Sequence, residues 1–172
     1  MPSVTVKRDL NDAIYFVTMT IFRWYRIFDM PGQWDILTHS LNYCKKQKGL
    51  KIYGYVFMLN HIHLIIQAPN VGGFLRDFKS HTAKALIKNL EKTSPNILKK
   101  FRYTGSGYNF WQKTNMPIPI FTEKIFQQKL NYIHHNPVRK GYVANPEDWE
   151  WSSASYYYAG MQGGIEIDDI NN

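Results

Sequence analysis

The chain has 172 residues, a length that fits one domain with a sound hydrophobic core. Its 44% hydrophobic and 16% aromatic content excludes a disordered chain, and no apolar run is long enough to span a bilayer. The single cysteine, Cys44, cannot form an intrachain disulfide, and the N-terminus lacks a secretion-signal pattern, so the sequence predicts a reducing, cytoplasmic setting.

Charge is the most informative feature of the composition. Lys and Arg number 21 against 13 for Asp and Glu, which gives a net charge of +8. The last twelve residues contain three of the acids and no base, so residues 1–160 carry a larger positive excess than the whole chain. A domain this basic favours a polyanionic partner, most often nucleic acid, over a merely soluble basic protein. We therefore expect one domain at 1–160, followed by a flexible acidic tail at 161–172.

The first half of the chain predicts three strands and a helix. Residues 14–22 are rich in β-branched and aromatic side chains, as in a strand. Residues 33–48 place apolar side chains three to four positions apart, which predicts an amphipathic helix. Strands at 50–58 and 61–68 follow, joined by a tight turn, and this pair predicts an antiparallel hairpin. Because both faces of the hairpin are apolar, the sheet should be covered, at least in part, on both sides.

A second helix is predicted from Phe74 to about Glu91, after a break at Pro69 and a loosened stretch at Gly72-Gly73. Residues 92–116 then interleave basic, aromatic and glycine residues. This mixture is typical of a loop that holds single-stranded nucleic acid by charge and stacking. Within this stretch, Phe110 and Trp111 are expected to anchor the hydrophobic core instead of stacking on nucleic acid.

A short edge strand is expected after Pro117 and Pro119, and a third helix from Glu123 to about His135. Pro137 prevents this helix from continuing. Tyr132 and Asn136 are four positions apart, so they share one helical face if the helix reaches that far. Taken singly, a helical tyrosine indicates packing and an asparagine at a helix end indicates a cap.

Two histidines interrupt the apolar strand at 61–68. Side chains alternate between the faces of a strand, so His61 and His63 should share one face while Ile62 and Leu64 point to the other. Two neutral imidazoles at this spacing can share one divalent cation. The alternative is a polar patch with one exposed and one hydrogen-bonded histidine, because two histidines are one ligand short of a convincing metal site.

Five sequence blocks occur in one order along the chain: F-M-L-N-H-I-H-L-I-I (57–66), F-K-S-H-T-A-K (78–84), F-W-Q (110–112), Y-I-H-H-N-P-V-R-K-G-Y-V (132–143) and P-E-D-W-E-W-S-S (146–153). Together they resemble the single-tyrosine HUH transposases, and specifically the REP-associated tyrosine transposase branch, over roughly residues 10–158. The resemblance implies an α+β fold, a ferredoxin-like antiparallel β-sheet with flanking helices, as in HUH endonucleases and IS200-like transposases.

The same resemblance implies a DNA-cleaving site. His61, His63 and Asn136 would be the ligands of Mg²⁺ or Mn²⁺, and Tyr132 would be the nucleophile that forms a 5′-phosphotyrosine link with single-stranded or hairpin DNA. The basic side chains expected at the DNA are Lys79, Lys84, Lys99, Lys100, Arg102, Arg139 and Lys140. The resemblance leaves open whether the chain acts as a monomer or a homodimer.

Two other functions remain open from the sequence. One is a catalytically inactive regulator on the same fold that binds repeat DNA or RNA. The other is a metal-dependent hydrolase that uses water as its nucleophile, for which carboxylate ligands would be expected near the histidines.

Overall fold

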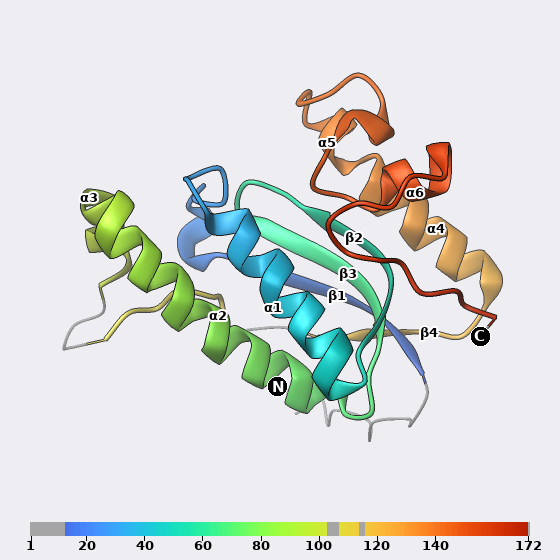
Figure 1. Ribbon diagram of the computed structural model, residues 1–172, viewed down its shortest axis with the longest axis horizontal. Helices are drawn as coiled ribbons and strands as arrows, with labels where there is room; N and C mark the ends of the chain where they lie inside the picture. The colour runs from blue at the N-terminus through green and yellow to red at the C-terminus, as the bar shows by residue number, and fades with distance from the viewer. Residues whose placement is uncertain (1–12, 103–106, 114–115, 172) are drawn as a thin grey trace, which may run out of the picture.

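The computed structural model describes residues 13–102, 107–113 and 116–171 (Figure 1). In this part of the chain, four strands form one antiparallel sheet in the order β2-β3-β1-β4. The strands are β1 (Ile14–Thr20), β2 (Lys51–Phe57), β3 (His61–Gln67) and β4 (Ile118–Ile120). The helices are α1 (Gln33–Lys48), α2 (Val71–Thr93), α3 (Pro95–Leu98), α4 (Glu123–His134), α5 (Asn136–Arg139) and α6 (Ala154–Ala159), with 3₁₀ turns η1 (Phe22–Trp24), η2 (Lys99–Phe101) and η3 (Pro146–Asp148).

The order β1-α1-β2-β3-α2-β4 along the chain, with β1 and β3 central in the sheet, is the split βαβ arrangement of ferredoxin-like folds. The predicted fold class is therefore confirmed. The predicted hairpin of β2 and β3 is also present, and the short edge strand β4 is found slightly earlier than predicted, since it includes Pro119 instead of following it.

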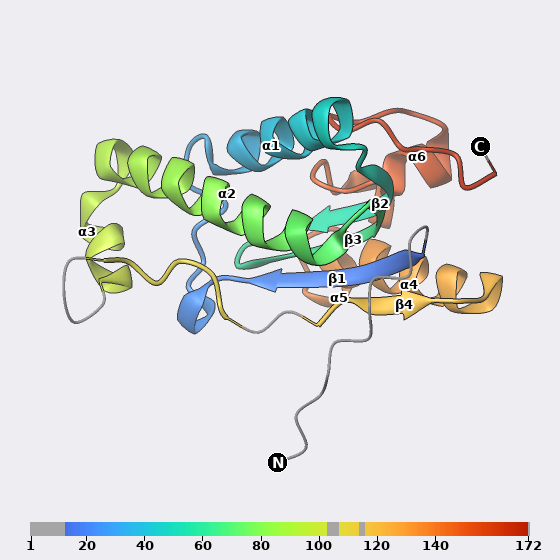
Figure 2. The ribbon, with the colours of Figure 1, turned by 90° about the horizontal axis from the view of Figure 1, so that it is seen from below.

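Helices pack on both faces of the sheet, with α1 and α2 on one side and α4 on the other (Figure 2). Strand alternation divides the apolar side chains between the two layers. Val17 and Leu64 belong to the core under α1 and α2, whereas Phe16 and Ile65 belong to the core that α4 completes with Leu130. The expectation that the sheet is covered on both sides is thus correct.

Helix α2 begins three residues earlier than predicted, at Val71 instead of Phe74. The side chain of Asn70 caps its N-terminus, because its Oδ1 accepts a hydrogen bond from the amide of Gly73 at 2.6 Å. Gly72 and Gly73, predicted to loosen the chain, therefore lie in the first turn of the helix.

Gly54 allows α4 to approach the sheet closely. A Cβ atom at this position would lie 2.8 Å from Cδ1 of Leu130 and 3.2 Å from Cδ1 of Ile133. Gly54 also follows the point where the register between β2 and β3 shifts. The distance between α4 and the sheet therefore depends on the absence of a side chain at residue 54.

Gly54→Val is expected to lower the free energy of unfolding by about 1–3 kcal/mol, because the added methyl groups force apart two packed layers. Denaturant unfolding followed by circular dichroism measures the change. Gly107→Val is the matched control, since apart from its chain neighbours no heavy atom of the described residues lies within 4 Å of a Cβ built there. Equal losses in the two variants would contradict the close-packing argument.

Residues 165–168 pack against the domain, which corrects the prediction of a flexible tail for this part of 161–172, whereas Asn172 lies outside the described residues. Ile165 and Ile167 are buried, and the amide of Asp168 donates to the carbonyl of Ile52 at 2.9 Å. In Figure 1 this segment runs beside β2. The two isoleucines are two positions apart, a spacing typical of a half-buried extended segment. This spacing could have predicted the packing, but the acidic composition of the segment favoured a flexible tail instead.

Asp168→Ala is expected to lower the free energy of unfolding by roughly 1–2 kcal/mol. The Asp168 carboxylate accepts a hydrogen bond from the amide of Ile52 at 2.7 Å and forms an ion pair with Lys45. Thermal unfolding should show the loss. Asp169→Ala is the control, since that carboxylate bonds to nearby Asn171, and it should change stability by less than about 0.5 kcal/mol.

Candidate active site

The two histidines of β3 lie on the side of the sheet that faces α4. Their ring centres are 4.8 Å apart, and both side chains are buried. Ile62 and Leu64 point to the opposite core, under α1 and α2. The prediction that His61 and His63 share one face is therefore confirmed.

Hydrogen bonds hold each imidazole through its Nδ1 atom. His63 Nδ1 lies 2.8 Å from Oγ1 of Thr18, and His61 Nδ1 lies 2.7 Å from Oδ1 of Asn60. The amide nitrogen of Asn60 donates to the carbonyl of Trp24, so its oxygen must face His61, and His61 must carry its proton on Nδ1. In this tautomer Nε2 of His61 carries no proton, so its lone pair is available to bind a metal ion.

His63 Nε2 is buried and has no hydrogen-bond partner among the described residues. A buried nitrogen without a partner is costly, and a bound ion is one of the few features that explain it. The pair of histidines therefore fits a divalent cation held through the two Nε2 atoms. In the described part of the chain no group of three His, Cys, Asp or Glu side chains could hold a metal, so among these residues a third ligand would have to be of another type, such as an asparagine.

Burial and nearby positive charge keep both imidazoles neutral. Burial, assisted by Lys140, lowers the pKa of His61 to about 4. Burial also lowers the pKa of His63 to about 3, with smaller effects from His61, Lys129 and Arg139. The neutral form of imidazole is the form that binds a metal ion, so near neutral pH these side chains need not lose a proton to do so.

Helix α4 brings Tyr132 to the histidines. Its N-terminus is capped by Thr122, whose Oγ1 accepts from the amide of Ile125 at 3.2 Å. Its apolar face is buried against the sheet, and Tyr132 lies at the edge of that face with 44% of its surface exposed. The ring of Tyr132 is 5.5 Å from the ring of His63 and 6.2 Å from that of Phe16. An accessible phenol thus lies directly beside the histidine pair.

The helix does not continue through Asn136. It ends at His134, and the short helix α5 begins at Asn136, followed by Pro137, which has no amide hydrogen. Asn136 is nevertheless buried at this junction. Lys140, which follows α5, is close enough to lower the pKa of His61 electrostatically. The junction that carries Asn136 therefore lies on the same side of β3 as the histidines.

Arg139 of α5 holds Tyr132 by two contacts. Its Nη2 donates to the carbonyl of Tyr132 at 2.6 Å, and its guanidinium lies 4.7 Å from the centre of the Tyr132 ring. That carbonyl lies in the last turn of α4, where helical acceptors lose their usual partners. The bond and the cation–π contact together position the phenol ring at the end of the helix.

The predicted DNA-binding residues fall into three places. Arg139 and Lys140 lie at the site, and Lys99, Lys100 and Arg102 are exposed around η2, with Lys100 5.8 Å from the centre of the Tyr25 ring. Lys79 and Lys84 belong to α2, on the opposite face of the sheet. Lys79 also donates to the carbonyl of Gln112 at 2.5 Å, so it anchors the chain between η2 and β4.

Sequence reasoning missed Lys129 and Asn60. Lys129 precedes Tyr132 by one helical turn, and its Nζ lies 4.7 Å from the centre of the Phe16 ring, which itself stacks on His63. The three-residue spacing from Tyr132 was available in the sequence as a signal. Asn60 gave no such signal, because an asparagine in a hairpin turn is expected to stabilise the turn and not to contact a side chain of the site.

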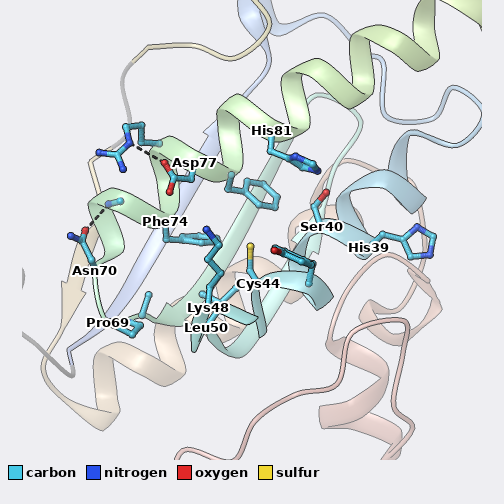
Figure 3. A pocket seen from close by; sticks show the side chains of 15 residues that line it. His39, Ser40, Cys44, Lys48, Leu50, Pro69, Asn70, Phe74, Asp77 and His81 are labelled. Atoms are coloured by element: carbon cyan, nitrogen blue, oxygen red, sulfur yellow. Dashed lines mark hydrogen bonds and ion pairs between the residues drawn. The ribbon is translucent and has the colours of Figure 1, made fainter. Parts of the chain in front are cut away.

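A separate cavity of about 690 Å³ lies between α1 and α2 (Figure 3). Its lining includes Cys44, Phe74 and Phe78, and it is on the other side of the sheet from the histidines. Burial raises the pKa of the Cys44 thiol. A nucleophilic thiol needs the opposite shift, so these surroundings favour a structural role for Cys44.

A family model described as "Transposase IS200 like" matches residues 13–136, a stretch that contains His61, His63, Tyr132 and Asn136. The chain belongs to the IS200-like transposase family. No helix in the described ranges has the length and apolar character required to cross a membrane.

Two relatives carry the name that the sequence blocks suggested. The chain is 26% identical over 124 residues to a REP-associated tyrosine transposase of Escherichia coli (strain K12), covering 72% of this chain and 66% of that protein. It is 32% identical over 98 residues to a putative REP-associated tyrosine transposase of Haemophilus influenzae (strain ATCC 51907 / DSM 11121 / KW20 / Rd), covering 55% and 53%. The matched regions thus span slightly less than two thirds and about half of these relatives.

A solved structure of a REP-associated tyrosine transposase bound to a REP hairpin has the same fold. It superposes with a TM-score of 0.67 at 19% identity, covering 95% of this chain and 90% of that one. The agreement confirms the ferredoxin-like architecture that the sequence blocks implied.

Proposed function

We propose that this IS200-like family member is a metal-dependent single-tyrosine transposase that cleaves and rejoins single-stranded or hairpin DNA through a 5′-phosphotyrosine intermediate. The observation that carries the proposal is the accessible ring of Tyr132, 5.5 Å from the ring of His63, whose buried Nε2 has no partner among the described residues. A nucleophile and a metal-binding group adjacent to each other are what phosphodiester cleavage requires.

His61, His63 and Asn136 would hold Mg²⁺ or Mn²⁺, which when bound supplies a Lewis acid for a nonbridging phosphate oxygen. In the cleavage step the phenolic oxygen of Tyr132 bonds to phosphorus as the bond from phosphorus to the 3′-oxygen breaks. The phenol gives up its proton, and the leaving oxygen takes one to become a free 3′-hydroxyl. The phosphotyrosine bond conserves the energy that later rejoining requires.

Positive charge at the site suits a phosphodiester substrate. Arg139 holds the nucleophile, and Lys129 and Lys140 act electrostatically on the histidines, so all three lie close to the place where the scissile phosphate would bind. The net charge of +8 supports a polyanionic partner more generally. The similar solved protein holds a REP hairpin, which supports hairpin DNA as the substrate class for this chain.

Two other functions are less well supported. A catalytically inactive DNA- or RNA-binding regulator has no need for an accessible tyrosine beside two buried histidines. A metal hydrolase that uses water would leave Tyr132 without a role. It would also favour carboxylate ligands, and the described residues contain no acidic side chain that completes a three-ligand group with the histidines.

One experiment separates the three functions. The protein is incubated with Mn²⁺ and a single-stranded hairpin DNA labelled at both ends, and the products are run on native and denaturing gels. A covalent adduct that survives denaturation supports the transposase. A shift seen only under native conditions supports the regulator, and free nicked DNA without an adduct supports the hydrolase.

A further inference from the structure

The turn that follows β1 has a strained backbone beside the candidate active site. Arg23 has φ 54° and ψ 21°, and Trp24 has φ 59°. They are the two non-glycine residues with positive φ in the described part of the chain. The left-handed region is unfavourable for L side chains, and two such residues in succession persist only where the surrounding structure holds them there.

The strain does not serve to bury Trp24. Its side chain is 58% exposed, whereas its neighbours Phe22 and Tyr25 pack against the core. A large indole in water contributes little to folding, so stability of the domain does not explain why the backbone adopts this conformation. Left-handed residues at functional sites commonly hold a side chain in a position that ligand binding requires.

Hydrogen bonds connect this turn directly to the histidine pair. The amide of Ile21 donates to the carbonyl of Asn60 at 2.9 Å, and the Asn60 side chain donates to the carbonyl of Trp24 at 3.1 Å. The same Asn60 side chain accepts from His61 at 2.7 Å. One asparagine therefore fixes both Trp24 and His61, and the two rings lie 6.3 Å apart at an interplanar angle of 71°.

The surroundings of the indole are basic. Arg23 and Arg26 are exposed on either side of Trp24 in the sequence. Lys100 lies 5.8 Å from the centre of the Tyr25 ring, and Lys140 lies near His61. An exposed aromatic ring among cations is the arrangement by which proteins hold unpaired nucleotides, with stacking on the base and charge on the phosphates.

We propose that Trp24 is a stacking platform for an unpaired nucleobase of the DNA strand that enters the His61–His63 site. Asn60 ties the backbone of Trp24 to His61, and the indole lies 6.3 Å from that imidazole, so a base stacked there would orient the adjoining phosphate towards the site. This inference rests on the proposed function for the identity of the strand. Stacking itself requires neither cleavage nor a metal, so it can be tested separately.

The test measures binding of fluorescein-labelled oligodeoxyadenylate, and of an abasic oligomer of the same length, by anisotropy in EDTA. The protein carries Tyr132→Phe throughout, so no adduct can form. We expect this protein to prefer the base-containing strand by roughly 5- to 150-fold, the range found for loss of one base–aromatic stack. Trp24→Gly should abolish the preference, and Trp24→Phe should keep most of it.

Thermal unfolding of Trp24→Gly provides a second readout. Glycine adopts positive φ without strain, so the unfolding temperature should stay the same or rise while the base preference is lost. Tyr43→Ala is the matched control, because Tyr43 is also 58% exposed but lies on α1 at the opposite face, and it should leave the preference unchanged. A preference that survives Trp24→Gly, its absence in the parent protein, or a marked fall in unfolding temperature would overturn the proposal. A missing adduct in the native protein would instead count against the proposed function alone.

Discussion

Tyr132→Phe is expected to abolish the covalent protein–DNA adduct, with cleavage reduced by at least about 10⁴-fold. The change removes only the phenolic oxygen. The ring that contacts His63 and Phe16 and lies beside the Arg139 guanidinium is kept, so the fold and the DNA affinity should remain close to native. A denaturing gel with labelled hairpin DNA measures the adduct, and anisotropy with the same DNA measures binding.

Tyr142→Phe is the matched control for this experiment. Tyr142 is another exposed tyrosine, in the segment after α5, and its ring contacts Trp149 at 5.6 Å instead of the histidines. The control should form the adduct at the native rate. If the Tyr132→Phe protein still formed an adduct, another residue would have to be the nucleophile and the assignment would fail.

The position of Tyr132 depends on core packing as much as on the residues around it. Leu130 and Ile133, on either side of it in sequence, pack against the sheet where Gly54 leaves room for them. A shift of α4 away from β2 would move the phenol relative to β3. For this reason Gly54→Val should also reduce adduct formation, even in protein that remains folded at the assay temperature.

Most of the fold could be predicted from the sequence, because its strands and helices have clear periodicity. Alternation placed His61 and His63 on one face of β3, and the structure confirms this placement. The start of α2 and the packed C-terminal segment could not be predicted in the same way. The start of α2 depends on the side chain of Asn70, which caps a first turn that contains two glycines. The packing of the C-terminal segment depends on long-range contacts of Asp168 with β2 and α1.

The candidate site was predictable only in part. Its residue types follow from the resemblance to known transposases, but nothing in the spacing alone shows that α4 reaches β3. Lys129 acts through a contact with distant Phe16, and Asn60 joins its neighbour His61 to distant Trp24. The basic-aromatic run at Phe22 to Arg26 is visible in the sequence, but the strain that turns Trp24 outward is a property of the folded backbone alone.

His63→Ala is expected to eliminate metal-dependent cleavage and to weaken Mn²⁺ binding by at least about tenfold. The substitution removes the buried Nε2 that has no partner among the described residues, and so removes one of the two imidazoles available to a cation. Titration calorimetry with Mn²⁺ measures the affinity, and the gel assay with and without EDTA measures the reaction. His81→Ala is the control, because His81 is exposed on α2 across the sheet. Adduct formation in EDTA, or unchanged Mn²⁺ affinity in His63→Ala, would show that the histidine pair serves another purpose.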